Sequence, residues 1–291
     1  MFKGSMVALV TPFSKGKFDE KRFCDLIEWH ISQGTHGIVP CGTTGEASTL
    51  DFEEHYRVIE VAVKTVNGRI PVLAGAGSNS TDEAIQITKK TKQLGANGAL
   101  IVTPYYNKPT QEGLYQHYKT IAGAVDIPIV MYNVPGRTSV NMLPSTVARL
   151  MEFKNIVGLK EATGDMRQAS DLVRLCGSRL TLLSGDDFTT FTMLALGGNG
   201  GISVTANVAP KEFADMFNAW EKGDIKKARD LHLRMEPLNA SMFLETNPIP
   251  AKTALAIMGK VEEEFRLPLC NMSSANRDKL REALKDAGII K

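Results

Sequence analysis

The chain has 291 residues, of which 43% are hydrophobic and 23% are charged, and its formal net charge at pH 7 is +2. These proportions are ordinary for a globular protein and exclude an intrinsically disordered chain. Because both signs of charge are mixed along the sequence, nothing favours a nucleic-acid or an anionic-membrane partner. The length allows one large hydrophobic core or two smaller ones.

The cysteines and the apolar runs indicate the compartment. The four cysteines lack metal-type or redox-type spacing, which favours buried thiols in a reducing environment; they are Cys24, Cys41, Cys176 and Cys270. The apolar opening at residues 1–10 is too short for a signal peptide and is followed by Pro12. No apolar run reaches membrane-spanning length. We therefore expect a cytoplasmic protein with no membrane partner.

Eight short apolar runs recur along the chain, with their starts roughly 20 to 35 residues apart, as expected of βα units with short loops. The runs occupy residues 6–10, 37–39, 71–75, 99–102, 128–132, 157–160, 180–184 and 201–204. They lack polar alternation, which predicts parallel strands buried on both faces. Eight such units predict a (β/α)₈ TIM barrel over residues 1–224. An open doubly wound sheet is the structural alternative.

Helix signals separate these runs. Asp51 and Ser80 stand at N-cap positions, each followed three residues later by a glutamate, which is typical of a capping box. Beyond residue 224 the pattern is only helical, at residues 226–243, 250–259 and 276–287. We expect a C-terminal α-helical region over residues 225–291 that serves assembly or bracing rather than chemistry.

The stretch at residues 156–162, which contains the sixth apolar run, carries its one lysine, Lys160, near its end. A charged ammonium is costly to desolvate, so such a lysine either turns outward to water or is kept because its neutral amine is used. A lysine whose pKa is lowered to about 7–8 is the nucleophile that an imine-forming enzyme needs. The solvated lysine at a strand end is the alternative.

The active site of a barrel lies where its strands finish, so the residues at these ends are the candidates for chemistry. They are Thr43, Thr44, Glu46, Tyr105, Tyr106, Tyr132, Arg137, Lys160, Gly185 and Ile202. This set contains no cluster of His, Asp and Glu able to hold a metal, so we expect no metal site.

Each of these candidates also has a structural alternative. The glycine-rich turn at residues 42–46 is either a simple tight turn or a nest of backbone N–H groups for a carboxylate. Tyr132 either fills a barrel mouth or acts as a general acid–base beside a lysine imine. Arg137 is either a surface cation or a bidentate ligand for an anionic substrate.

Five segments in this order resemble the dihydrodipicolinate synthase family, and the similarity runs nearly end to end. They are residues 42–46, 104–109, 132–138, 158–161 and 184–187. The enclosing superfamily of pyruvate-dependent class I aldolases, which includes N-acetylneuraminate lyase, shares the lysine, the tyrosine and the glycine-rich turn. The Thr43–Thr44 pair and Arg137 after Gly136 are specific to the narrower family.

The resemblance implies a reaction and roles for the candidates. Lys160 forms a Schiff base with pyruvate, and the derived enamine adds to the aldehyde of L-aspartate 4-semialdehyde. Ring closure then gives 4-hydroxy-tetrahydrodipicolinate, at the first committed step of the diaminopimelate and lysine pathway. The resemblance implies that Tyr132, Thr43 and Tyr106 relay protons. It also implies that Thr44, Arg137, Gly185 and Ile202 bind the substrates, and it implies no cofactor.

The resemblance also implies an assembly and an inhibitor. The neighbouring subunit of a tight dimer would supply Tyr106, within a homotetramer built as a dimer of dimers. Lysine, the pathway product, would bind at the dimer interface to residues matching those of regulated members, namely Ala47, Ser48, His55, Asn79, Glu83 and Tyr105. Phe52 and Ala47 stand where sensitive enzymes often carry histidine and serine, so we expect weakened inhibition.

Two other functions remain open from the sequence. One is a pyruvate aldolase that acts on a sugar acid or a longer aldehyde, which Arg137 speaks against. The other is a catalytically silent paralogue that senses a keto acid or an amino acid. The complete set of lysine, tyrosine and threonine speaks against a sensor, because a sensor needs no proton relay.

Overall fold

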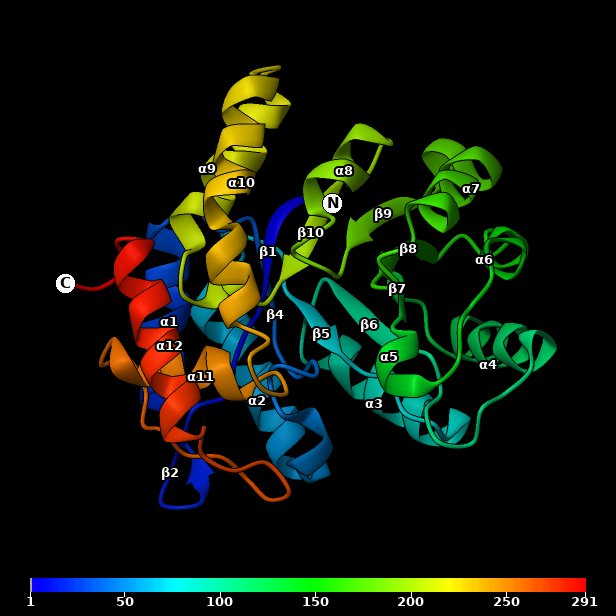
Figure 1. The fold of residues 1–291 in the computed structure, drawn as a ribbon. Coiled ribbons are helices and arrows are strands. Elements are labelled where there is room, and N and C mark those ends of the chain that lie inside the picture. Colours follow the sequence, from blue (N-terminus) through cyan, green and yellow to red (C-terminus); the bar gives the residue numbers. More distant parts are fainter. Residues whose placement is uncertain (1) are drawn as a thin grey trace. The chain divides into compact units, whose positions relative to one another are not determined.

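The computed structural model describes residues 2–291, and Figure 1 shows its helices and strands. The described residues divide into two compact units, the first made of residues 2–3 and 71–202 and the second of residues 4–70 and 203–291. Eight strands form one sheet in the order β4-β1-β10-β9-β8-β7-β6-β5. Every recorded pair of neighbouring strands in this sheet is parallel.

The first unit contains consecutive βα elements. Its strands are β5 (Leu73–Gly75), β6 (Gly98–Val102), β7 (Ile129–Asn133), β8 (Ile156–Glu161), β9 (Thr181–Ser184) and most of β10 (Gly200–Ser203). Its helices are α3 (Thr81–Gln93), α4 (Gln111–Ala124), α5 (Pro135–Thr138), α6 (Pro144–Leu150), α7 (Met166–Cys176), the short η2 (Gly177–Arg179) and α8 (Thr190–Ala195). From β5 to β10 the spatial order of the strands is their sequence order, which excludes the doubly wound alternative.

The second unit holds both ends of the βα series and the C-terminal helices. Its strands are β1 (Gly4–Ala8), β4 (Gly37–Val39) and the antiparallel pair β2 (Phe13–Ser14) and β3 (Lys17–Phe18). Its helices are α1 (Glu20–Ser32), η1 (Ala47–Thr49), α2 (Phe52–Val66), η3 (Thr205–Asn207), α9 (Pro210–Glu221), α10 (Ile225–Ser241), α11 (Ile249–Ile257) and α12 (Ser274–Asp286). The small hairpin of β2 and β3 was not predicted.

The eight predicted strands are confirmed, with ends shifted by at most two residues. They form because runs such as Ile129–Asn133 have no polar alternation, and all five residues of that strand are buried. The predicted helix starts are also confirmed. The carboxylate of Asp51 accepts a hydrogen bond from the N–H of Glu54 at 2.8 Å, and the hydroxyl of Ser80 accepts one from the N–H of Glu83 at 3.4 Å.

The three helices expected after residue 224 are present as α10, α11 and α12. Helix α10 packs along α9, as Figure 1 shows, and α12 packs on α10 and α11 through the buried Leu280 and Leu284. These helices belong to the same compact unit as β1 and β4. The compact units do not test the predicted boundary between residues 224 and 225, which stays a prediction.

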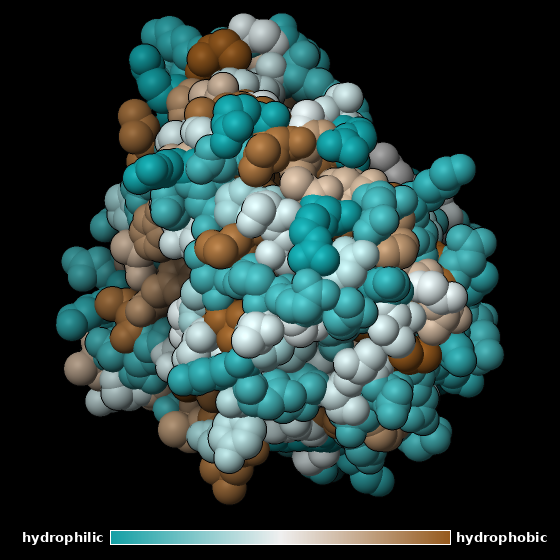
Figure 2. Space-filling view, turned by 90° about the vertical axis from the view of Figure 1, so that its right-hand side faces the viewer, coloured by the Kyte–Doolittle hydropathy of each residue, from teal (hydrophilic) through white to brown (hydrophobic). Residues whose placement is uncertain are grey.

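Charged and polar residues cover most of the face shown in Figure 2, and apolar residues lie among them singly or in small groups. Among residues 2–291, no helix is long and apolar enough to cross a membrane. Cys41 and Cys176 are buried, as expected, but Cys24 is half-buried and Cys270 is exposed. The prediction of four buried thiols is thus wrong for Cys270, which lies in the loop before α12.

Candidate active site

Lys160 lies near the carboxyl end of β8 and is buried, with 6% of its surface exposed. Strand β8 pairs with β7 so that Lys160 stands opposite Tyr132, which is 7% exposed. The Nζ atom of Lys160 lies over the aromatic ring of Tyr132, 4.2 Å from its centroid. The solvated lysine at a strand end is therefore wrong, and the amine is held against a phenol in a desolvated environment.

Gly185 follows β9 and provides the space that Lys160 occupies. A Cβ atom at Gly185 would lie 2.9 Å from Cε and 3.0 Å from Cγ of Lys160, and 2.8 Å from Cβ of Ala162. The N–H of Gly185 also donates to the carbonyl of Glu161 at 2.7 Å, which fixes its backbone beside β8. A residue predicted only as a substrate contact thus also gives the lysine side chain room to lie where it does.

A buried polar network behind the Lys160–Tyr132 pair was not found by the sequence reasoning. The carboxylate of Glu161 accepts hydrogen bonds from Nδ2 of Asn133 at 3.1 Å, Nε2 of Gln168 at 3.2 Å and the N–H of Thr163 at 2.8 Å. Asn133 and Glu161 stand opposite each other in the register, one position after the Tyr132–Lys160 pair. The network therefore holds the ends of β7 and β8 in register.

Arg137 is placed by the segment that follows β7. The short helix α5 begins at Pro135, whose fixed φ suits a first helical position. The side chain of Arg137 is exposed. The loop after α5 returns to the buried network, because the N–H of Met142 donates to Oδ1 of Asn133 at 2.9 Å. Arg137 thus lies on a segment whose following loop is hydrogen-bonded to the strand that carries Tyr132.

The segment after β6 places two tyrosines at the surface of the first unit. Tyr106 is 90% exposed and has a left-handed backbone with φ of 72°, unusual for a tyrosine. Nδ2 of Asn79 donates to the carbonyl of Tyr105 at 3.1 Å, and Nδ2 of Asn107 donates to the carbonyl of Asn79 at 2.9 Å. These bonds hold the loop, and the phenol of Tyr106 is exposed to solvent.

The glycine-rich turn after β4 lies in the second unit. Thr44 is buried and Thr43 is half-buried. Cys41 and Glu46 have left-handed backbones, with φ of 54° and 52°. A Cβ at Gly45 would approach Cys41 N and Leu9 O to 3.1 Å, so glycine is required there. The turn is rigid, with the N–H of Gly45 donating to the carbonyl of Gly42 at 3.1 Å.

The remaining candidates divide between the two units. In the first, the hydroxyl of Ser78 donates to Glu83 at 2.7 Å, close in sequence to Asn79, and Ile202 is buried in β10. In the second, Ala47 is half-buried, Ser48 is exposed and His55 is buried on α2. Asn79 therefore contacts the backbone of Tyr105, Glu83 lies near the start of α3, and Ala47, Ser48 and His55 follow the turn after β4.

Two other features do not support chemistry at this site. Burial raises the pKa of the Cys41 thiol, so Cys41 is a packing residue rather than a nucleophile. Among residues 2–291, no group of three or more His, Cys, Asp and Glu side chains could hold a metal ion.

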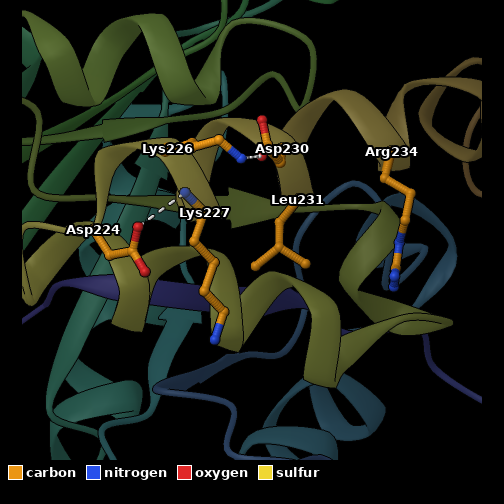
Figure 3. A pocket seen from close by; sticks show the side chains of 6 residues that line it. All are labelled: Asp224, Lys226, Lys227, Asp230, Leu231 and Arg234. Carbon is orange, nitrogen blue, oxygen red and sulfur yellow. Dashed lines mark hydrogen bonds and ion pairs between the residues drawn. The ribbon is translucent and has the colours of Figure 1, made fainter.

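A hollow lies at the start of α10 (Figure 3). It is lined by Asp224, Lys226, Lys227, Asp230, Leu231 and Arg234. Its carboxylates are already engaged, since Nζ of Lys226 donates to Asp230 at 2.9 Å and Asp224 caps the N–H of Lys227 at 3.1 Å. With exposed charges of both signs and no buried reactive group, it is a solvated surface rather than a catalytic site.

A barrel strand that ends in a buried lysine, with a tyrosine against the amine, defines the class of lysine-dependent aldolases. The model of the dihydrodipicolinate synthetase family matches residues 1–287. The chain belongs to this family, and it is a carbon–carbon lyase of the class I aldolase type.

Individual relatives match along the whole chain. The 4-hydroxy-tetrahydrodipicolinate synthase of Thermodesulfovibrio yellowstonii is 72% identical over 291 residues, covering 100% of both chains. The crystal structure of the enzyme from Acinetobacter baumannii complexed with pyruvate is 50% identical, with a TM-score of 0.98 and 100% of both chains covered. The lysine-bound enzyme of Cyanidioschyzon merolae is 40% identical, with a TM-score of 0.96 and 99% of both chains covered. These matches confirm the predicted (β/α)₈ barrel.

Proposed function

We propose that this chain condenses pyruvate with L-aspartate 4-semialdehyde to give 4-hydroxy-tetrahydrodipicolinate, the first committed step towards diaminopimelate and lysine. Relatives 72% and 58% identical over the whole chain are named for this product. The observation that carries the proposal within this chain is the buried amine of Lys160 lying 4.2 Å from the ring centroid of Tyr132.

Lys160 acts as the nucleophile. Its neutral amine adds to the keto carbon of pyruvate, and loss of water gives the Schiff base. Loss of a proton from the methyl carbon gives an enamine, whose carbon adds to the aldehyde of the semialdehyde. The amine of the second substrate then closes the ring and releases the lysine. The tight space beside Gly185 favours a single orientation of the Lys160 chain during these steps.

Tyr132, Thr43 and Tyr106 form the proton relay for these steps. A tyrosine with a pKa near 10 is a poor base alone, so a chain of hydroxyls divides the transfer into short steps. The exposure of Tyr106 on a fixed loop supports its use by a neighbouring subunit rather than by its own. A tight dimer is then the smallest active unit, and two such dimers form the homotetramer.

The carboxylates of the two substrates bind at different places. The backbone of the turn at Thr44 and the backbones at Gly185 and Ile202 hold pyruvate, and the turn's rigid left-handed ends suit a nest of N–H groups. Arg137, exposed on α5, binds the carboxylate of the semialdehyde bidentately. This residue favours the semialdehyde over a sugar acid as second substrate.

Lysine inhibits the enzyme by binding at the dimer interface. The Cyanidioschyzon merolae relative has lysine bound. In this chain the matching residues are Ala47, Ser48, His55, Asn79, Glu83 and Tyr105. Glu83 is exposed and able to pair with an ammonium, whereas Phe52 and Ala47 supply no polar contact. Inhibition is therefore present but weakened, in a cytoplasmic enzyme that works upstream of its inhibitor. Initial rates measured against added lysine test this, and unchanged rates up to millimolar lysine would contradict it.

The proposed activity is tested by reducing the protein with borohydride in the presence of pyruvate and locating the adduct by mass spectrometry. We expect one pyruvate-derived adduct at Lys160 and none in Lys160→Ala. A coupled assay then compares aspartate semialdehyde with sugar acids. An adduct that forms without turnover of the semialdehyde would exclude this function, and no adduct at all would favour a sensor.

A further inference from the structure

Glu46, the last residue of the glycine-rich turn, is a carboxylate with only 2% of its surface exposed. Its Oε1 accepts a hydrogen bond from Nζ of Lys252, and its Oε2 accepts one from the N–H of Arg266 at 3.3 Å. Because the backbone of Glu46 is left-handed, the turn holds this residue in a conformation that a side chain ordinarily disfavours. A buried charge at a strained position of a substrate-binding turn calls for an explanation.

Lys252 is completely buried within α11. Besides Glu46, its Nζ donates to the carbonyl of Glu264 at 3.0 Å and lies 4.2 Å from the ring centroid of Phe13. Burial lowers the pKa of Lys252, and the charge of Glu46 opposes this effect. The ammonium is thus enclosed by one carboxylate, one carbonyl and the rings of Phe13 and Phe265, all of them in the second unit.

The two residues before Glu46 are also held from outside the turn. Nδ2 of Asn247, just before α11, donates to Oγ1 of Thr44 at 3.0 Å. The hydroxyl of Thr11 donates to the carbonyl of Gly45 at 2.7 Å. Three consecutive turn residues are therefore fixed by side chains that come from other parts of the chain. Residues after 240 supply two of these three contacts.

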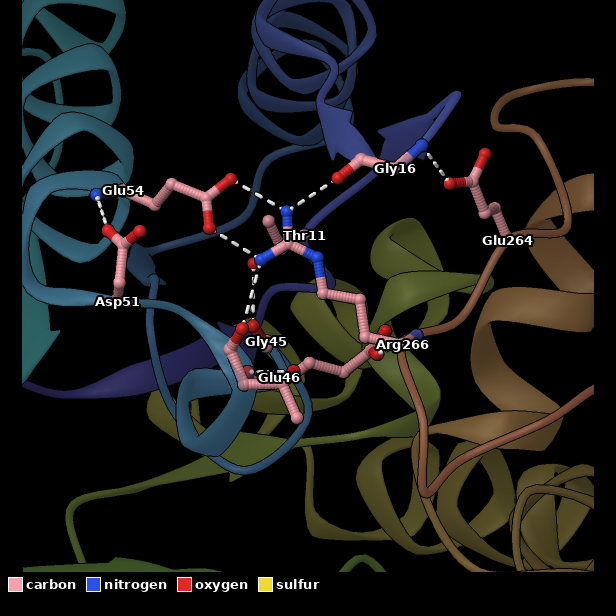
Figure 4. A network of polar contacts seen from close by, with 9 residues as sticks. Thr11, Gly16, Gly45, Glu46, Asp51, Glu54, Glu264 and Arg266 are labelled. Carbon is pink, nitrogen blue, oxygen red and sulfur yellow. Dashed lines mark hydrogen bonds and ion pairs between the residues drawn. The ribbon is translucent and has the colours of Figure 1, made fainter.

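The loop beyond α11 is fixed in turn by Arg266 (Figure 4). Its guanidinium donates to the carboxylate of Glu54 at 2.5 and 2.6 Å and to the carbonyl of Gly16 at 2.9 Å. Glu264 accepts from the N–H of Gly16 at 2.5 Å. In Figure 4 these groups converge around Arg266, with Gly45 and Glu46 beside them. These contacts fix the loop that supplies the carbonyl of Glu264 to Lys252.

Stability alone does not explain such a pair. The desolvation of two buried charges offsets most of their attraction, and replacing a buried ion pair by apolar residues of similar volume is often neutral or stabilising. The ion pair fixes the position of the Glu46 carboxylate, and the hydrogen bond from Asn247 fixes the hydroxyl of Thr44. Together these contacts orient the turn. The backbone N–H groups of the turn must point correctly to bind a carboxylate.

We propose that Lys252 and Asn247 are positioning residues that orient the turn at Thr44 for the carboxylate of pyruvate. This inference rests on the proposed function, because it assigns these two residues to the binding of its first substrate. Neither residue touches the reacting atoms. Their loss should weaken the binding of pyruvate without a matching loss of folding or of affinity for the second substrate.

The test is the double variant Glu46→Gln/Lys252→Met, which removes both charges together and leaves neither buried alone. We expect the KM for pyruvate to rise by at least about 10-fold, while the KM for aspartate semialdehyde and the thermal midpoint change little. The same rise should appear as a shift of the pyruvate concentration that gives half-maximal borohydride trapping at Lys160.

The matched control is Glu263→Gln/Arg277→Met, which removes another ion pair of the C-terminal helical region. That pair joins α12 to the loop after α11, and Glu263 also accepts from Oγ1 of Thr253 at 3.1 Å. The control should keep the wild-type KM for pyruvate. Asn247→Ala, which removes the donor to Thr44, is measured in parallel so that the inference stays testable if the double variant does not fold.

A wild-type KM for pyruvate in the folded double variant, or in Asn247→Ala if the double variant does not fold, overturns the inference and leaves the proposed function intact. An equal rise of the KM for pyruvate in the control overturns the inference as well. It would mean that any ion pair of the C-terminal helical region affects pyruvate binding to the same extent. If the wild-type enzyme forms no adduct at Lys160, the proposed function fails, and this inference fails with it.

Discussion

Lys160 and Lys252 are both buried, but they differ in what surrounds them. Lys160 lies near the end of an apolar strand, where the local pattern allows either a solvated lysine or a buried amine, and the resemblance to a family favours the buried amine. Lys252 stands in a helix, where a lysine ordinarily lies on the solvated face. Only its partner Glu46, 206 residues away in the chain, explains its burial. The local pattern cannot predict the burial of a charge when the partner that accounts for it lies far away in the sequence.

Gly185 is the residue whose substitution should most directly disturb Lys160. In Gly185→Ala the new methyl group would overlap Cε and Cγ of Lys160, so the amine must move. We expect the kcat/KM for pyruvate to fall on the order of 10- to 100-fold, because small misplacements of a nucleophile are costly. Steady-state kinetics and borohydride trapping measure this.

The control for this substitution is Gly123→Ala on α4, where an added Cβ meets nothing within 4 Å. It should leave the kinetics unchanged and stabilise the helix slightly. Equal kinetics in Gly185→Ala and wild type would show that Lys160 relocates without cost.

Two buried histidines should lower the free energy of unfolding in mild acid. Burial lowers the pKa of His30 to about 3 and that of His117 to about 4. In the unfolded chain both bind a proton near pH 6.5, so below that pH the unfolded state binds more protons and the free energy of unfolding falls. The expected slope is about 1.4 kcal/mol per pH unit for each histidine.

Denaturant unfolding between pH 7 and pH 4.5 measures this slope. His30→Gln should remove the contribution of one histidine to the slope. The variant should therefore lose less stability than wild type over the same pH range. Identical slopes in the two proteins would mean that His30 is protonated in the folded state, contrary to its burial.

At the scale of elements, strands and helix starts are encoded locally, and that is why they could be predicted. Apolar runs and caps such as Asp51 need only neighbouring residues. The network of Asn133 and Glu161 depends instead on the register between β7 and β8. A signal was present, since each of these residues directly follows a predicted catalytic residue, but only the pairing of strands shows that the two side chains meet.

This network should contribute strongly to stability. Glu161→Leu removes the acceptor of the Thr163 N–H and one acceptor of the Asn133 and Gln168 amides, which both keep Oδ1 of Asn141. We therefore expect the free energy of unfolding to fall by about 1–3 kcal/mol. Denaturant unfolding measures the change.

The comparison is Glu112→Ala, which breaks the exposed pair with Arg149. This change should cost less than about 1 kcal/mol, because exposed ion pairs contribute little. Equal effects in Glu112→Ala and Glu161→Leu would contradict a structural role for the buried network.

At the scale of the whole molecule, the proposed sharing of Tyr106 between subunits predicts complementation. Tyr106→Phe and Lys160→Ala should each be nearly inactive alone. In a mixed dimer, the site with an intact Lys160 receives an intact Tyr106 from its partner. Random reassortment of an equal mixture should restore about a quarter of the wild-type sites.

Activity is measured after the two variants are unfolded and refolded together, with each variant refolded alone as the control. If Tyr106 served its own subunit, no combination of these two chains would contain a complete site. Mixtures that stay inactive would therefore contradict the proposal that the dimer is the smallest active unit.

The contacts between the C-terminal helices and the first strands could not be predicted from the sequence. The pattern changes from βα units to helices near residue 224, and the boundary expected there stays a prediction. Helix α9 packs on β1, and α10 packs along α9, so the C-terminal helices share a compact unit with the first strands. The sequence shows where the βα pattern gives way to a helical one. Which helices pack against which strands depends on contacts between residues far apart in the sequence.

The long separation between Glu46 and Lys252 also matters while the protein is being made. Ribosomes add about 5–20 residues per second, so the carboxylate leaves the ribosome about 10–40 s before the ammonium that will meet it. During that interval the turn carries a charge that cannot be buried, and it must stay hydrated. The turn, which is synthesised early, can therefore reach its final form only after residue 252 has been translated.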